Sequence, residues 1–94
     1  MNNISQERTK HFKEWLDNKY QIIPKDIRQT LYDIFELIQE PFEKYTPSGR
    51  CFLNYDYCVY KMLELLDKND IYNVKIELTK YEDELWEKII KYIS

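Results

Sequence analysis

The chain of 94 residues lacks alanine altogether and has a single glycine, Gly49. Alanine is the strongest helix former, so its absence is not a structural preference. Together with eleven isoleucines and nine tyrosines, it indicates codon usage in an AT-rich genome. A lone glycine excludes a glycine-rich phosphate-binding loop and a nucleophile elbow, because both need several glycines at fixed spacing.

Metal-binding side chains are scarce too: the chain has two cysteines, Cys51 and Cys58, and one histidine, His11. A structural zinc site needs four ligands of the cysteine and histidine type, so the count excludes one. A disulfide is not expected, because seven residues of helix separate two positions by roughly 10 Å. Both cysteines are predicted to be small apolar fillers, and no metal or other cofactor is expected.

No pattern in the chain predicts catalysis. Segment 67–78 begins like a calcium-binding loop, but Tyr72 stands where the turn needs glycine and Leu78 where a bidentate glutamate belongs. The acidic cluster 82–84 lies at an expected helix start, where carboxylates favour the helix dipole. We therefore expect a protein that is not an enzyme.

Long hydrophobic runs are also absent, and nothing approaches the roughly 18 apolar residues of a membrane span. The first ten residues have no apolar signal-peptide core. These features predict a soluble intracellular protein.

A net charge of −3 argues against nucleic-acid binding through a broad basic surface. Residues 1–28 nevertheless carry six basic against four acidic side chains.

Apolar residues at three- and four-residue spacing predict about four helices. The second helix should begin at Pro24 and end near Glu40, because Pro41 follows. Asn54 can cap the third helix, and Thr79 with Glu82 has capping-box spacing for the fourth. The expected buried faces are Ile4, Phe12, Trp15 and Leu16; Ile27, Leu31, Ile34, Phe35 and Ile38; and Leu85, Trp86, Ile89, Ile90 and Ile93. The fold class is a single all-α domain over residues 1–94, bundle-like or orthogonal.

Residues 54–66 concentrate tyrosines on two sides of the predicted third helix. Tyr57, Tyr60 and Lys61 fall opposite the apolar stripe. Loops 41–50 or 69–78 could cover these rings, or the rings could form a contact surface for a protein or for single-stranded bases. If they contact a protein, replacing Tyr57 and Tyr60 with alanine should abolish recovery of the partner and leave the fold intact. The predicted core stripe is Tyr55, Val59, Met62, Leu63 and Leu66, flanked by Cys58 and Leu65.

The same segment resembles the viral late transcription factor 3-like family of poxviruses and other large cytoplasmic DNA viruses. The resemblance is carried by Arg50, Phe52, Leu53, Asn54, Tyr55, Tyr57, Tyr60, Lys61 and the run 63–66. A second, looser match is "KYEDELWEKIIKYI", so the similar region spans about residues 42–93. Longer members are expected to carry a cysteine-rich, zinc-binding part upstream, which this sequence lacks.

The resemblance implies a non-enzymatic module that supports late viral transcription by binding the viral RNA polymerase or other late transcription factors. It implies a location in the viral factory of the host cytoplasm or in the virion. The residues expected to bind the partner are Arg50, Asn54, Tyr57, Tyr60 and Lys61, with Asn54 also a helix cap. The alternatives are a nucleic-acid-binding protein, with weak binding expected, and a protein-interaction adaptor unrelated to transcription. The sequence could be a stand-alone paralogue or a C-terminal module.

Overall fold

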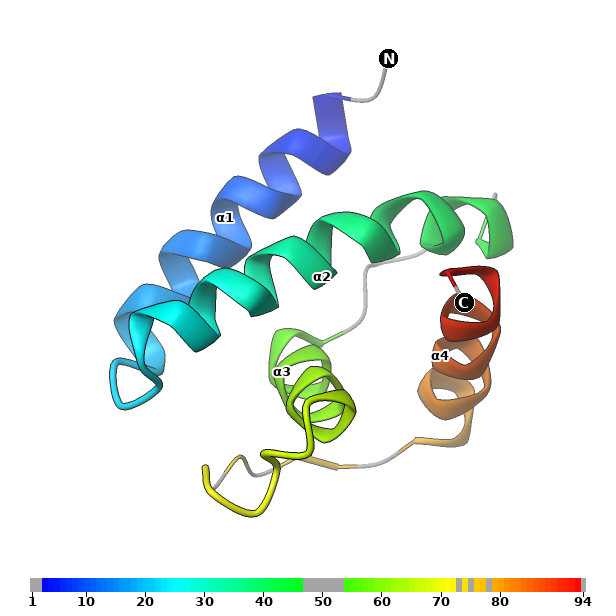
Figure 1. Ribbon diagram of the computed structural model, residues 1–94. Helices are drawn as coiled ribbons and strands as arrows, with labels where there is room; N and C mark the ends of the chain where they lie inside the picture. Colours follow the sequence, from blue (N-terminus) through cyan, green and yellow to red (C-terminus); the bar gives the residue numbers. More distant parts are fainter. Residues whose placement is uncertain (1–2, 47–53, 73, 75, 78, 94) are drawn as a thin grey trace.

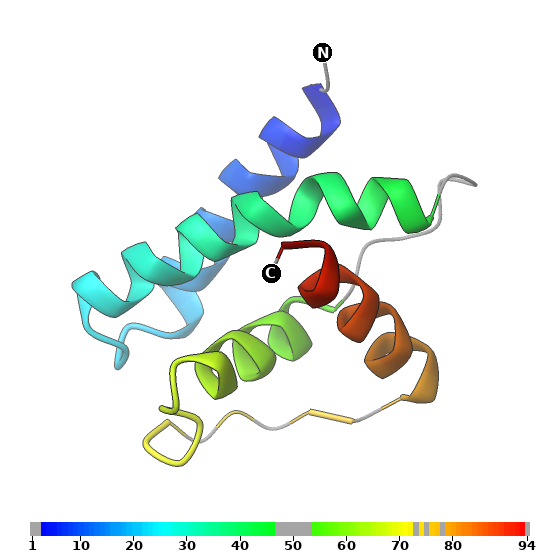
Figure 2. The ribbon, with the colours of Figure 1, turned by 45° about the vertical axis from the view of Figure 1, so that its right-hand side comes forward.

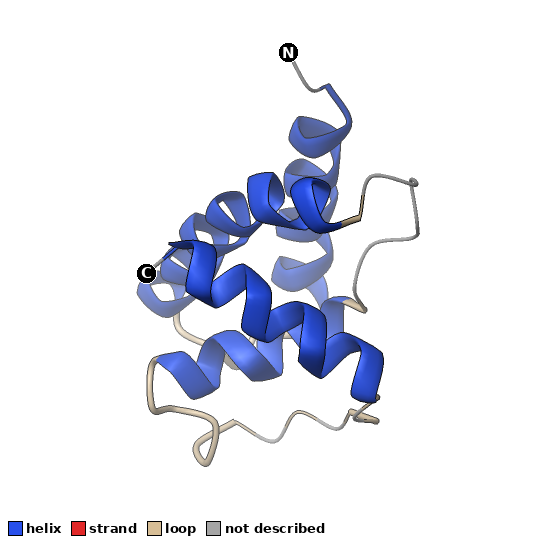
Figure 3. Cartoon of the chain, turned by 90° about the vertical axis from the view of Figure 1, so that its right-hand side faces the viewer, coloured by secondary structure: helices blue, strands red, loops and turns tan. Residues whose placement is uncertain are grey.

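A computed structural model describes residues 3–46, 54–72, 74, 76, 77 and 79–93. Over these residues the chain forms helices and loops and no strand, which confirms the all-α single domain (Figure 3). The helices are α1 (Asn3–Lys19), α2 (Lys25–Tyr45), α3 (Tyr55–Leu65) and α4 (Lys80–Ile93).

Helix α2 is the centre of the arrangement, because α1, α3 and α4 all pack against it. A short turn at residues 20–24 joins α1 to α2, and the two helices run back along each other (Figure 1). A long connection returns from the end of α3 to the start of α4, so that both helices begin on the same side of the molecule (Figure 2).

The core forms where the predicted apolar faces of the helices meet. The Phe12 ring of α1 stacks on the Phe35 ring of α2, with centroids 4.0 Å apart. Leu16 and Ile38 are fully buried beside them. The periodicity therefore identified the inner faces of α1 and α2 correctly. Ile4 lies outside the residues whose side chains are described, and Ile93, expected inside, is 38% exposed because it sits in the last turn of α4.

The expected end of the second helix near Glu40 is wrong, because α2 continues through Pro41 to Tyr45. A proline inside a helix removes the hydrogen bond to the carbonyl four residues earlier, here that of Leu37. Pro41 and Phe42 are both buried, so burial against the rest of the core offsets this local cost. The hydroxyl of Thr46 donates to the Phe42 carbonyl at 2.6 Å and satisfies one carbonyl at the helix end.

Both predicted helix caps are confirmed. The side-chain oxygen of Asn54 accepts from the backbone N–H of Asp56 at 2.8 Å, at the start of α3. The hydroxyl oxygen of Thr79 accepts from the backbone N–H of Glu82 at 3.3 Å, at the start of α4. Because each bond satisfies a backbone donor that the helix leaves unpaired, these residues fix where the two helices begin.

Tyrosine–aspartate hydrogen bonds tie distant elements together. The phenol of Tyr32 on α2 donates to Asp17 on α1, and that carboxylate also pairs with Arg28 at 2.8 Å. The phenol of Tyr20 donates to Asp56 on α3, which Lys19 contacts at 2.9 Å. Burial, followed by the bond to Asp17, raises the pKa of Tyr32 to about 12. The fold therefore favours the neutral phenol.

This shift predicts a loss of stability in alkali. A tyrosine with a folded pKa of about 12 and an ordinary value of 10.0 stabilises the fold fully below pH 10, and this contribution is lost as the pH rises from 10 through 12. Denaturant unfolding at several pH values should show a steeper decline for the parent than for Tyr32→Phe. Equal declines would show that Tyr32 is not bonded as described.

Candidate protein-interaction groove between α3 and α4

Of the five residues expected to bind a partner, the structure describes four, and these four do not all lie on the surface. Arg50 lies outside the described residues. Asn54 is exposed and caps α3, and its backbone N–H donates to Glu82 Oε2 at 3.3 Å. Tyr57 is buried, whereas Tyr60 and Lys61 are partly exposed further along α3. Among the described candidates, Tyr60 and Lys61 are therefore the two neighbours that remain partly exposed for direct contact.

The expected outward position of Tyr57 is wrong: its side chain is 1% exposed. Helix α4 covers the ring, since Trp86 meets it edge-on with centroids 6.3 Å apart. The phenol donates to Asp83 Oδ1 at 2.5 Å. Burial, followed by this hydrogen bond, raises the pKa of Tyr57 well above its ordinary value. Tyr57 joins α3 to α4, and α4 covers its ring, while Ile76 and Glu77 of the 69–78 loop line a cavity beside it.

Tyr60 and Lys61 lie one turn further along α3. Tyr60 packs its ring partly against the core. The ammonium of Lys61 lies 3.1 Å from Glu64 Oε1, three residues later on the same helix. Lys61 therefore stands on the surface of α3 at the boundary with α4.

Lys61 lines a groove of about 420 Å³ between α3 and α4. The groove has apolar side chains from both helices, namely Leu65, Trp86 and Ile90. Leu65 is 48% exposed, although the sequence placed it at the flank of the core. The remaining lining residues are charged: Lys61, Glu64, Glu87 and Lys91. An apolar floor between charged rims is the composition of a protein contact site, where apolar burial supplies affinity and charges set orientation.

The two rims of the groove differ in how their charges are paired. On the α3 rim, Lys61 and Glu64 form an ion pair with each other. On the α4 rim, neither Glu87 nor Lys91 takes part in an ion pair with the described residues. These two groups are four positions apart, so they project from one side of α4. The α4 rim can thus offer one negative and one positive group to a partner.

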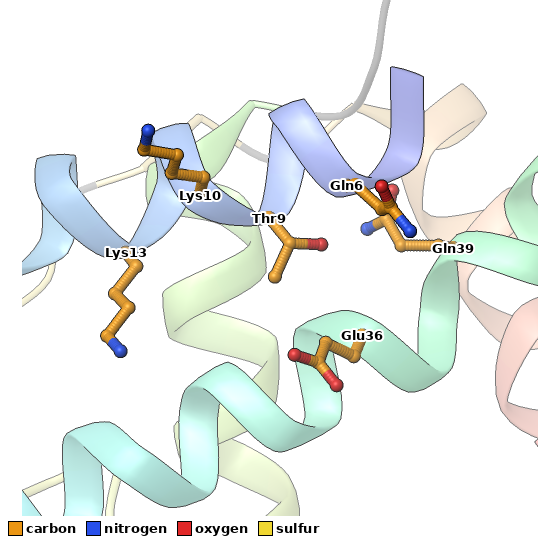
Figure 4. Close-up of a pocket in the computed structure, with 6 residues that line it drawn as sticks. All are labelled: Gln6, Thr9, Lys10, Lys13, Glu36 and Gln39. Atoms are coloured by element: carbon orange, nitrogen blue, oxygen red, sulfur yellow. The ribbon is translucent and has the colours of Figure 1, made fainter. Parts of the chain in front are cut away.

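A second groove, of about 580 Å³, lies between α1 and α2. Figure 4 shows Lys13 and Thr9 directed from α1 toward Glu36 on α2, while Lys10 extends away from α2. Other cations of this region are engaged within the fold, because Arg8 donates to Gln39 and Arg28 pairs with Asp17. The basic excess of residues 1–28 is reduced by Lys19, which pairs with Asp56 of α3.

Cys58 is fully buried, and burial raises the pKa of its thiol. This confirms the expected apolar role for Cys58, whereas Cys51 lies outside the described residues. No group of three or more metal-ligating side chains is assembled among the residues that the structure describes. None of the helices there is both long and apolar enough to cross a membrane.

These observations predict that neither metal nor disulfide stabilises the fold. A chelator and a reductant, added separately, should leave the thermal unfolding transition unchanged, because Cys58 packs as an apolar side chain. Metal content of the purified protein is the control. Stoichiometric zinc, or a lower transition temperature with reductant, would contradict the prediction.

The fold defines a small helical module with a groove between α3 and α4, and comparison with known proteins gives its family. Residues 16–94 match the family described as "Poxvirus Late Transcription Factor VLTF3 like". The chain belongs to this family. The match begins in α1, so it includes all of α2 as well as the segment from residue 42 that first carried the resemblance.

One relative is a protein of Paramecium bursaria Chlorella virus 1, described as a "Putative transcription factor". It is 36% identical over an alignment of 73 positions, and the alignment covers 71% of this chain. The aligned region covers 20% of the relative, so the chain spans about a fifth of that protein's length. No solved structure matches the chain.

Proposed function

We propose that the chain is a non-enzymatic module of the late viral transcription apparatus and binds the transcription machinery through the α3–α4 groove. The observation that carries the proposal is membership of the late transcription factor family over residues 16–94. The same membership supports a place of action where late viral genes are transcribed, in the viral factory of the host cytoplasm. The partner in this proposal is a subunit of the viral RNA polymerase or another late transcription factor.

The groove is the surface best suited to this partner. Leu65 is a large apolar side chain held half-exposed beside the Trp86 and Ile90 side chains. Covering it would remove apolar area from water, the main source of affinity at protein interfaces. Lys61, which the sequence singled out, stands on the rim and would act mainly on the rate and salt dependence of association.

The proposal is tested by capture of partners from extracts of infected cells with the tagged chain. Leu65→Glu places a charge in the groove and should reduce recovery of polymerase subunits by at least about tenfold. Leu37→Glu is the matched control, because Leu37 is 58% exposed on α2 and does not line the groove. Circular dichroism establishes that both variants fold. Equal recovery by the two variants would contradict docking at the groove.

Nucleic-acid binding is a second candidate function, favoured by Lys10 and Lys13 beside the α1–α2 groove. Arg28 and Lys19, which lie near these two lysines in the sequence, are paired with aspartates and so contribute less to the release of counterions. DNA titration at two salt concentrations distinguishes the candidates. The groove proposal expects weak binding that Leu65→Glu does not alter. Tight binding with a steep salt dependence, lost in Lys10→Glu/Lys13→Glu, would support nucleic acid instead.

A further inference from the structure

We propose that the α3–α4 groove is also a self-association surface, occupied by a second copy of this chain with the two α4 helices antiparallel. The argument begins with Glu87 and Lys91 on the α4 rim, which have no ion pair among the described residues. A partner that satisfies both must present a base opposite Glu87 and an acid opposite Lys91, about one helical turn, or ~6 Å, apart.

Helix α4 itself has this pattern. When two copies face each other across a twofold axis, Glu87 of each copy lies opposite Lys91 of the other. The α3 rim is compatible with the same symmetry, because Lys61 and Glu64 carry one charge of each sign. The rim as a whole has no net charge. The groove therefore adds no like-charge contacts to the repulsion that two chains of net charge −3 already have.

The apolar floor supplies the attraction between the copies. Leu65 stands half-exposed at the edge of the groove, close enough to Ile90 to line the same cavity. In the antiparallel arrangement Leu65 of each copy enters the groove of the other. The cavity is small, so the dimer is weak and forms in a concentration-dependent manner. The dimer covers Lys61 and Leu65, so a second copy and the transcription machinery cannot occupy the groove at the same time. This consequence alone rests on the proposed function.

The test first reverses the charge at Glu87 and then exchanges the charges of Glu87 and Lys91. Sedimentation equilibrium of the full chain alone measures the dissociation constant. The concentration runs from about 10 μM to 1 mM, a range suited to a weak interface. The parent should show a monomer–dimer equilibrium. Glu87→Lys places like charges opposite each other twice per dimer and should raise the dissociation constant roughly tenfold. The double variant Glu87→Lys/Lys91→Glu restores opposite charges and should return the constant to within about threefold of the parent.

Asp33→Lys is the control with the same change of charge, because Asp33 is exposed on α2 and does not line the groove. It should leave the dissociation constant unchanged, and Leu65→Glu should abolish the dimer. A chain that stays monomeric throughout the range overturns the proposal. Dimerisation that Glu87→Lys and the exchange variant weaken equally also overturns it. Because no partner extract is used, these outcomes are independent of partner capture.

Discussion

Replacing Trp86 with alanine should destabilise the protein by ~3–5 kcal/mol, a large part of the stability of a domain of this size. The side chain is 4% exposed and packs against Tyr57 at the junction of α3 and α4. Removing the indole leaves a cavity between two helices whose contact depends on large side chains. Denaturant unfolding of parent and variant measures the difference.

Tyr92→Ala is the matched control for this prediction. Tyr92 is an aromatic residue of the same helix, but it is 39% exposed, and its contacts with Glu40, Tyr45 and Lys44 lie at the surface. The control should cost about 1 kcal/mol or less. If Trp86→Ala unfolds at nearly the same denaturant concentration as the parent, the inner face of α4 has been assigned incorrectly.

The second large effect is expected at Tyr57. Tyr57→Ala should cost ~3–5 kcal/mol, because a fully buried ring is lost. Tyr57→Phe keeps the ring and removes only the hydrogen bond to Asp83, so it should cost about 1–2 kcal/mol. The alanine and phenylalanine variants together separate packing from hydrogen bonding in one unfolding experiment.

The stability measured for Tyr57→Ala would also decide how tyrosine substitutions in α3 are interpreted. From the sequence we expected a variant with alanine at both Tyr57 and Tyr60 to keep its fold. The premise that Tyr57 faces outward is wrong, because Tyr57 is in the core. Loss of partner binding in that variant would report unfolding. A Tyr57→Ala protein as stable as the parent would instead return Tyr57 to the candidate surface residues.

The sequence predicted the features that depend on neighbouring residues. Apolar spacing gave the inner faces of α1 and α2, and the polar side chains of Asn54 and Thr79 gave the starts of α3 and α4. These features are local: a cap bonds to a backbone group two or three residues away, and helical periodicity fixes which residues share a face.

The features missed from sequence depend on contacts between segments far apart in the chain. Tyr57 is buried by α4, more than 25 residues later in the chain. Helix α3 is therefore covered on a side that its own apolar periodicity predicts to face outward. Pro41 remains inside α2 because burial outweighs a local helix-breaking preference. The groove beside Leu65 arises only when α3 and α4 meet, and no single-helix pattern could have located it.

The most direct test of the groove as the docking surface is site-specific photo-crosslinking in infected cells. A photoreactive amino acid replaces Leu65 in one variant and Leu37 in the other, since both side chains are about half-exposed and only Leu65 lines the groove. Mass spectrometry then identifies the crosslinked proteins. Docking at the groove predicts a crosslink from position 65 to a subunit of the viral transcription machinery and none from position 37. Crosslinks to that machinery from position 37 alone would contradict it.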